Sequence, residues 1–69
     1  MDIDESNLLL KVVTLRQDIP EAGLTPGEQG TIVFIFEEPE LAFEVEFVDD
    51  QGSTIAQLAL TRNTFDLTD

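Results

Sequence analysis

The sequence predicts an all-β fold, a small antiparallel barrel of about four to five strands. Short runs rich in Val, Ile and Phe recur along the chain, and Gly, Pro or Asp bound them. One long connection, residues 16–29, precedes a tight central meander. The length of 69 residues permits a single domain, and closing its sheet would remove most exposed strand edges.

The first strand is expected within residues 8–15, a run rich in β-branched and aliphatic residues. It follows a polar, acidic segment, residues 1–7, which we expect to be flexible. Residues 8–69 then form the single domain. Because strand side chains alternate between the two faces, Val13 and Leu15 are expected to point inward.

The long connection carries two apolar residues, Ile19 and Leu24, among its Pro and Gly residues. Apolar residues in such a position usually bury their side chains, so we favour the interpretation that they close one end of the core. The alternative is that they line a binding groove.

The second strand, residues 31–36, is the most apolar stretch of the chain and is apolar on both faces. A strand with one buried face should alternate, so some other element must cover the second face. If Ile32 and Ile35 both point inward, the strand needs a bulge. Phe34 and Phe36 are then at least partly exposed, unless residues 8–10 or the long connection fold over the rings.

Residues 42–48 show the clearest strand pattern. Phe43, Val45 and Phe47 alternate with Glu44 and Glu46, so the first three are expected to point inward and the two glutamates outward. A further strand is expected over residues 54–60, with Ala56, Leu58 and Leu60 towards the core. The predicted core comprises Val13, Leu15, Phe43, Val45, Phe47, Ala56 and Leu58.

Residues 49–52 predict the hairpin turn between these two strands, since Gly52 can take a positive φ. The alternative for Asp49 and Asp50 is a calcium loop, but the ligand spacing and distal Glu of an EF-hand are missing. Near the C-terminus, residues 61–65 predict one helical turn and residues 66–68 a short closing strand.

The composition excludes several classes of function. The chain has neither Cys nor His, which removes disulfides, zinc sites and every catalytic triad that needs these residues. Its 15 acidic and 3 basic residues give a net charge of −12, which disfavours binding to nucleic acids and anionic membranes. We expect no cofactor and no metal. The acidic N-terminus lacks the basic start of a signal peptide, so a cytoplasmic protein fits best.

A set of short motifs gives the chain a family resemblance. Leu24-x-x-Gly27-x-x-Gly30-x-Ile32 resembles the glycine pattern of the KOW motif. A wider pattern resembles a family of small bacterial, largely cyanobacterial proteins catalogued as a domain of unknown function: Val12-Val13-x-Leu15, Asp18-Ile19-Pro20, Glu44-Val45-Glu46-Phe47-x-Asp49 and Gly52-x-Thr54. This resemblance implies an SH3-like antiparallel barrel and carries over no catalytic residue. The basic loops of nucleic-acid-binding KOW domains are missing, so RNA binding is not implied.

Carboxylates are the only abundant reactive groups in the chain. A paired-carboxylate hydrolase needs one acid desolvated in a concave pocket, whereas a barrel of this size fills its interior with side chains. We therefore expect a protein that is not an enzyme.

An aromatic patch rimmed by acids is the composition of a protein-binding site. We expect a non-catalytic module that docks a basic protein, such as a toxin that it neutralises or an enzyme that it regulates. The alternative is a structural accessory subunit or homodimer assembled through residues 31–36. The predicted protein-binding residues are Phe34, Phe36, Glu37, Glu38, Glu40, Glu44 and Glu46.

Overall fold

The computed structural model describes residues 5–68, and five antiparallel strands form one sheet in the order β4-β3-β2-β1-β5. The strands are β1 (Val12–Leu15), β2 (Gln29–Phe36), β3 (Ala42–Val48), β4 (Thr54–Leu60) and β5 (Phe65–Leu67). Short 3-10 turns precede β1 (η1, Glu5–Leu8), interrupt the long connection (η2, Pro20–Ala22) and join β4 to β5 (η3, Arg62–Thr64). The all-β prediction is confirmed, whereas the closer assignment to an SH3-like barrel stays a prediction.

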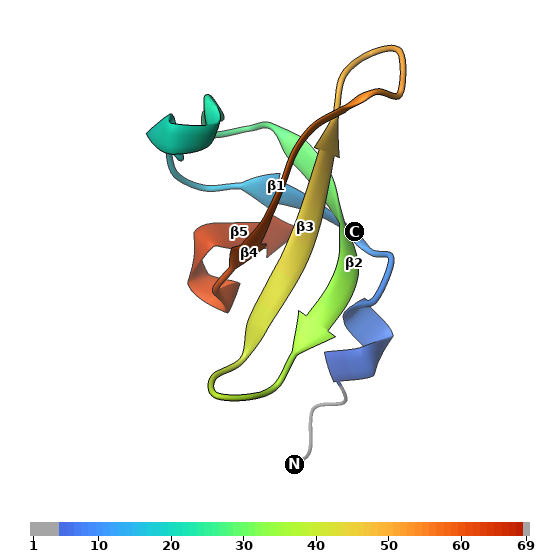
Figure 1. Ribbon diagram of the computed structural model, residues 1–69, viewed down its shortest axis with the longest axis vertical. Coiled ribbons are helices and arrows are strands. Elements are labelled where there is room, and N and C mark those ends of the chain that lie inside the picture. Colours follow the sequence, from blue (N-terminus) through green and yellow to red (C-terminus); the bar gives the residue numbers. More distant parts are fainter. Residues whose placement is uncertain (1–4, 69) are drawn as a thin grey trace.

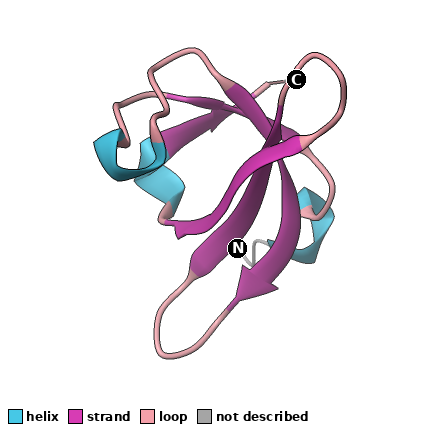
Figure 2. Cartoon of the chain, turned by 45° about the horizontal axis from the view of Figure 1, so that its top comes forward, coloured by secondary structure: helices cyan, strands magenta, loops and turns pink. Residues whose placement is uncertain are grey.

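The sheet is strongly bent, and its strands curve around a common interior (Figure 1, Figure 2). The ring of Phe65 on β5 packs edge-on against the ring of Phe43 on β3, with the centroids 5.5 Å apart. Strands that are distant in the sheet order therefore meet through their side chains, as in a barrel. The buried core consists of Val13, Leu15, Ile19, Leu24, Ile32, Phe43, Val45, Phe47, Leu60 and Phe65.

Most of the predicted core is buried, and the exceptions lie on β4. Ala56 and Leu58 face the core but are only half-buried. The reason is the place of β4 at the edge of the sheet, where it has a strand neighbour on one side alone. The other five predicted core residues, on β1 and β3, are buried as expected.

The long connection closes one end of the core. Ile19 and Leu24 are both buried, and two backbone hydrogen bonds join them across η2, from Ile19 N to Leu24 O (2.9 Å) and from Leu24 N to Ile19 O (3.1 Å). The interpretation that they plug the core is confirmed, and the groove alternative is wrong.

Several element boundaries differ from the prediction: β2 begins at Gln29, two residues earlier than expected, and both ends of the chain differ as well. The first strand begins at Val12, because Leu8 ends η1 and the chain turns at Leu10, which has a φ of 69°. At the other end, Phe65 does not belong to the helical turn; it is the first residue of β5 and is fully buried. Residues 1–4 lie outside the described part, so the flexibility of residues 1–7 stays a prediction.

Gly30 marks the closest approach of β2 to β3. A Cβ atom at this position would lie 2.6 Å from Cγ1 of Val45, 2.9 Å from the carbonyl oxygen of Glu46 and 2.9 Å from Cδ1 of Phe47. All three distances are too short for a carbon contact, and the backbone oxygen can yield only if the strand moves. Glycine at this position is thus a packing requirement.

Substitution of Gly30 by Ala should lower the free energy of unfolding by about 1–3 kcal/mol, the usual cost of overpacking. Urea denaturation measures this change. Ser53→Ala is the control, because Ser53 is exposed in the hairpin turn and should shift stability by less than about 0.5 kcal/mol. Equal stability of the two variants would show that β2 can move away from β3 at little cost.

Candidate protein-binding site

A β-bulge at Val33 decides which residues of β2 face outward. Ile32 lies opposite Val45 and Phe34 lies opposite Glu44, so Val33 is an extra residue of β2 relative to β3. Ile32 is buried and Ile35 packs against the core, as predicted. The bulge predicted from these two inward residues is therefore present.

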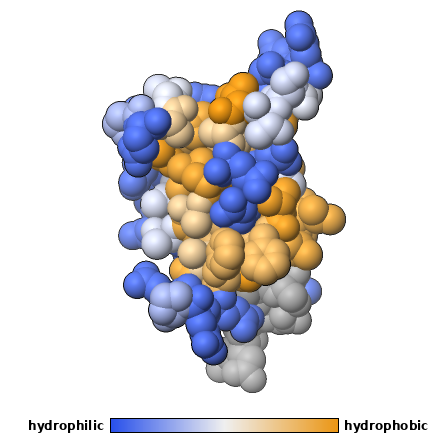
Figure 3. All heavy atoms as spheres, in the orientation of Figure 1, coloured by the Kyte–Doolittle hydropathy of each residue, from blue (hydrophilic) through white to orange (hydrophobic). Residues whose placement is uncertain are grey.

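The rings of Phe34 and Phe36 lie together on the outer surface. Their centroids are 4.8 Å apart and their planes are inclined by 61°, an edge-to-face arrangement. Phe34 is 55% exposed and Phe36 is 38% exposed. On the face drawn in Figure 3, hydrophobic residues cover much of the middle of the molecule around a hydrophilic cluster, and further hydrophilic residues lie towards both ends. The rings are thus exposed, as expected from the register.

A small apolar hollow lies beside these rings. It has a volume of about 230 Å³ and is lined by Leu9, Phe34, Ile35 and Glu37. Leu9 follows η1 and is 45% exposed. Leu9 therefore lies next to Phe34 without covering it. We call the surface formed by the rings of Phe34 and Phe36 and the adjoining aliphatic side chain of Leu9 the aromatic patch.

Acidic residues lie next to the aromatic patch in the following turn and on β3, and Glu46 lies further along β3, opposite Thr31. Glu37, Glu38 and Glu40 are exposed in the turn that joins β2 to β3. Glu44 and Glu46 lie half-buried on β3, where Glu44 is the direct cross-strand neighbour of Phe34. We call these five glutamates the acidic rim. The structure thus brings all seven predicted site residues to β2, β3 and the turn between them.

Uncharged residues of β4 hold the two β3 glutamates in place. The side-chain amide of Gln57 donates to Oε2 of Glu44 over 3.2 Å, and the hydroxyl of Thr54 donates to Oε2 of Glu46. These hydrogen bonds fix the carboxylates on the surface of the sheet without adding a positive charge.

The two arginines of the chain act elsewhere. Arg16 lies 3.8 Å from the carboxylate of Asp66 on β5. Arg62 lies over the ring of Phe65, 5.1 Å from its centroid, and its Nη1 donates to the Phe65 carbonyl over 3.0 Å. Both belong to the side of the molecule formed by β1, η3 and β5, so neither arginine neutralises the acidic rim.

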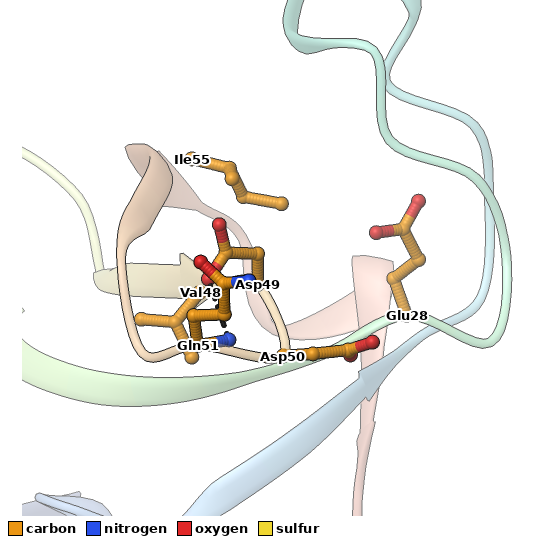
Figure 4. A pocket seen from close by; sticks show the side chains of 6 residues that line it. All are labelled: Glu28, Val48, Asp49, Asp50, Gln51 and Ile55. Carbon is orange, nitrogen blue, oxygen red and sulfur yellow. Dashed lines mark hydrogen bonds between the residues drawn. The ribbon is translucent and has the colours of Figure 1, made fainter.

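A second, more polar hollow lies at the β3–β4 turn and is lined by Glu28, Val48, Asp49, Asp50, Gln51 and Ile55 (Figure 4). The carboxylates of Glu28 and Asp49 stabilise local turns. Oδ1 of Asp49 accepts the N–H groups of Gln51 and Ser53, each over 2.9 Å, and Oε2 of Glu28 accepts the N–H of Thr25 over 3.0 Å.

The hydrogen bonds of Asp49 and the φ of 84° at Gly52 agree with the predicted hairpin turn. Within residues 5–68, no group of three or more acidic side chains is arranged to hold a metal ion. The described geometry thus favours the hairpin turn over the calcium loop.

The fold defines a small all-β domain, and its sequence is strongly acidic. The chain belongs to the family described as a domain of unknown function (DUF4926), whose family model matches residues 9–67. No curated protein and no solved structure matches it. Membership of a family of unknown function was predicted and is confirmed, while the bacterial source and the KOW resemblance stay predictions. In the described part of the chain, no helix has the length and hydrophobicity needed to span a bilayer.

Removal of an exposed ring should leave the fold intact. We expect Phe34→Ser to lower the free energy of unfolding by about 1 kcal/mol, because more than half of this side chain already contacts water. Phe47→Ala is the buried control and should cost about 3–5 kcal/mol. Urea denaturation compares the two, and similar losses would assign Phe34 to the core.

Added salt should stabilise the protein. The acidic rim places several like charges close together, and salt screens their repulsion in the folded state. We expect the melting temperature to rise between low salt and about 0.5 M NaCl, where the Debye length is short. The triple variant Glu37→Gln, Glu38→Gln, Glu40→Gln should gain less from the same salt. An equal gain in both proteins would show that repulsion in this turn is not the cause.

Proposed function

We propose that this protein is a non-catalytic protein-binding module that docks a basic protein on the aromatic patch and the acidic rim. The observation that carries the proposal is the pair of exposed, edge-to-face rings of Phe34 and Phe36. Aromatic side chains dominate the binding energy of many interfaces, because they bury a large area at a small loss of rotamer freedom. An exposed aromatic pair in so small a chain is therefore a good anchor for a partner.

The charge around the rings supports a basic partner. The acidic rim borders the rings on β3 and in the preceding turn, and both arginines lie elsewhere. Surface carboxylates of this kind speed the encounter with a positively charged surface and exclude acidic proteins. In this proposal the partner is a basic toxin that is neutralised, as by an antitoxin or immunity protein, or a basic enzyme that is regulated.

The same exposed rings would also suit a homodimer or an accessory subunit assembled through residues 31–36. This second candidate must bring the acidic side chains beside the rings of two chains, Glu44 among them, into one interface. We therefore favour the basic partner, and the experiment separates the two candidates.

A capture experiment tests the proposal. Tagged wild-type protein, incubated with a lysate of the source organism at low salt, should retain a basic protein that is released at about 0.5 M NaCl. The double variant Phe34→Ser, Phe36→Ser should lose this protein. The matched control is Val48→Ser, Ile55→Ser, which removes two exposed apolar side chains at the other end of the sheet and should retain it.

Three outcomes would contradict the proposal. The first is that the double variant captures the same protein as the wild type, and the second is that the captured protein is acidic. The third is that the purified chain forms a homodimer that the double variant does not form. Light scattering during gel filtration detects the last outcome and would favour the structural subunit.

A further inference from the structure

The second half of β2 has a free backbone edge. Within residues 5–68, β1 pairs with β2 only over Gln29–Thr31. Beyond these pairs, the N–H of Ile32 donates to the Lys11 carbonyl over 3.0 Å. The carbonyl of Ile32 accepts the N–H of Leu10 over 2.7 Å. On its other side, β2 stays paired with β3 as far as Phe36. In the described part of the chain, residues 33–36 therefore have a strand neighbour on one side alone.

The register shows which backbone groups point to this edge. In an antiparallel ladder, alternate residues direct their N–H and C=O groups to opposite neighbours. Ile32, opposite Val45, directs both groups away from β3. Ile35 lies opposite Phe43, two residues along β3 from Val45, so it has the same orientation. The N–H and C=O groups of Ile35 are thus aimed at the free edge.

The side chains along this edge form an apolar hollow and, next to it, an aromatic surface, and Phe34 belongs to both. Leu9, Phe34, Ile35 and Glu37 line the hollow of about 230 Å³, and Ile35 also packs against the core. On the outer side lie the rings of Phe34 and Phe36, with Glu44 directly across from Phe34 on β3. A strand added here would meet an apolar hollow with one face, and aromatic rings beside carboxylates with the other.

We propose that residues 33–36 of β2 accept an extended strand of a basic partner protein, in which Val-like apolar residues alternate with Lys or Arg. The inference rests on the proposed function and specifies the conformation and sequence class of the partner segment. The added strand pairs with Ile35, its apolar side chains fill the hollow, and its cationic side chains lie over Phe34 and Phe36 near the acidic rim.

Two of the features by which sheets usually prevent strand addition, charged side chains and Pro, are missing from this edge. Residues 33–36 contain no charged residue and no Pro, and the first charge along the strand is Glu37. β4 is the other long strand at an edge, but the hollow at its start is lined by the polar turn around Asp49 (Figure 4). Among residues 5–68, the β2 edge alone combines an unpaired ladder with an apolar hollow and exposed rings.

A synthetic peptide in which lysine alternates with valine is the probe, added at up to millimolar concentration to ¹⁵N-labelled protein and followed by NMR. The Ile35 amide should exchange rapidly in the free protein and become protected by about tenfold or more in the complex. In the proposed register the valine amides face β2 and the lysine amides face solvent. N-methylation of the valines should therefore weaken binding by about tenfold, while N-methylation of the lysines should not.

Variants of the protein complete the test. Leu9→Ser and Phe34→Ser should each weaken binding by about tenfold, and Ile55→Ser, which removes an equally exposed side chain elsewhere, should bind as the wild type does. The dispersion of the amide spectrum shows that each variant is folded.

Failure of the strand proposal is distinguishable from failure of the proposed function. Strand addition is overturned if both methylated peptides bind equally and Ile35 stays unprotected while Phe34→Ser still weakens binding; the proposed function then stands. Both proposals are overturned if Phe34→Ser binds the peptide as the wild type does and if the peptide affinity of the wild type is the same at low salt and at about 0.5 M NaCl. Absence of any binding at millimolar peptide also overturns the strand proposal.

Discussion

The bulge at Val33 is the constraint on which the outer surface of this protein depends. With strict alternation, Ile32, Phe34 and Phe36 would share one face of β2. The extra residue changes the parity, so that Ile32 and Ile35 reach the core while Phe34 and Phe36 stay outside. One inserted residue thus places aliphatic side chains in the interior and two adjacent rings on the surface.

The free edge of β2 follows from the lengths of the strands and the close approach at Gly30. β1 has 4 residues and β2 has 8, so β1 cannot accompany β2 along its whole length. Gly30 lets β2 approach β3 at the end where β1 pairs with β2, and the bulge bends β2 further along. The η1 turn then lies beside the unpaired half, where Leu9 helps to form the hollow.

The alternation of apolar and polar residues predicted those parts of the fold that depend only on neighbouring residues in the sequence. The alternation of Phe43 to Phe47 placed the glutamates of β3 correctly, because strand periodicity acts within one segment. The burial of Phe65 was missed, since it depends on a contact with Phe43, which is remote in sequence.

The candidate site likewise has features that the sequence predicts and features that it does not. Exposure of Phe34 and Phe36 could be inferred once Ile32 and Ile35 were assigned inward. The hollow and the free edge could not, because both depend on where β1 begins. That boundary is set by the turn at Leu10, a positive-φ residue within a run of apolar residues that hydrophobicity alone would extend as a strand.

Local charge, more than net charge, distinguishes a basic partner from a second copy of this chain. At physiological salt the Debye length is about 8 Å, so most of the 15 carboxylates of one chain are screened from those of another. The acidic rim, however, borders the rings themselves. In a symmetric dimer the same patch meets itself, which would bring Glu44 and the turn acids of both chains into one interface. Lys or Arg side chains opposite the same carboxylates convert that repulsion into attraction, so the arrangement around Phe34 and Phe36 suits a partner of opposite charge.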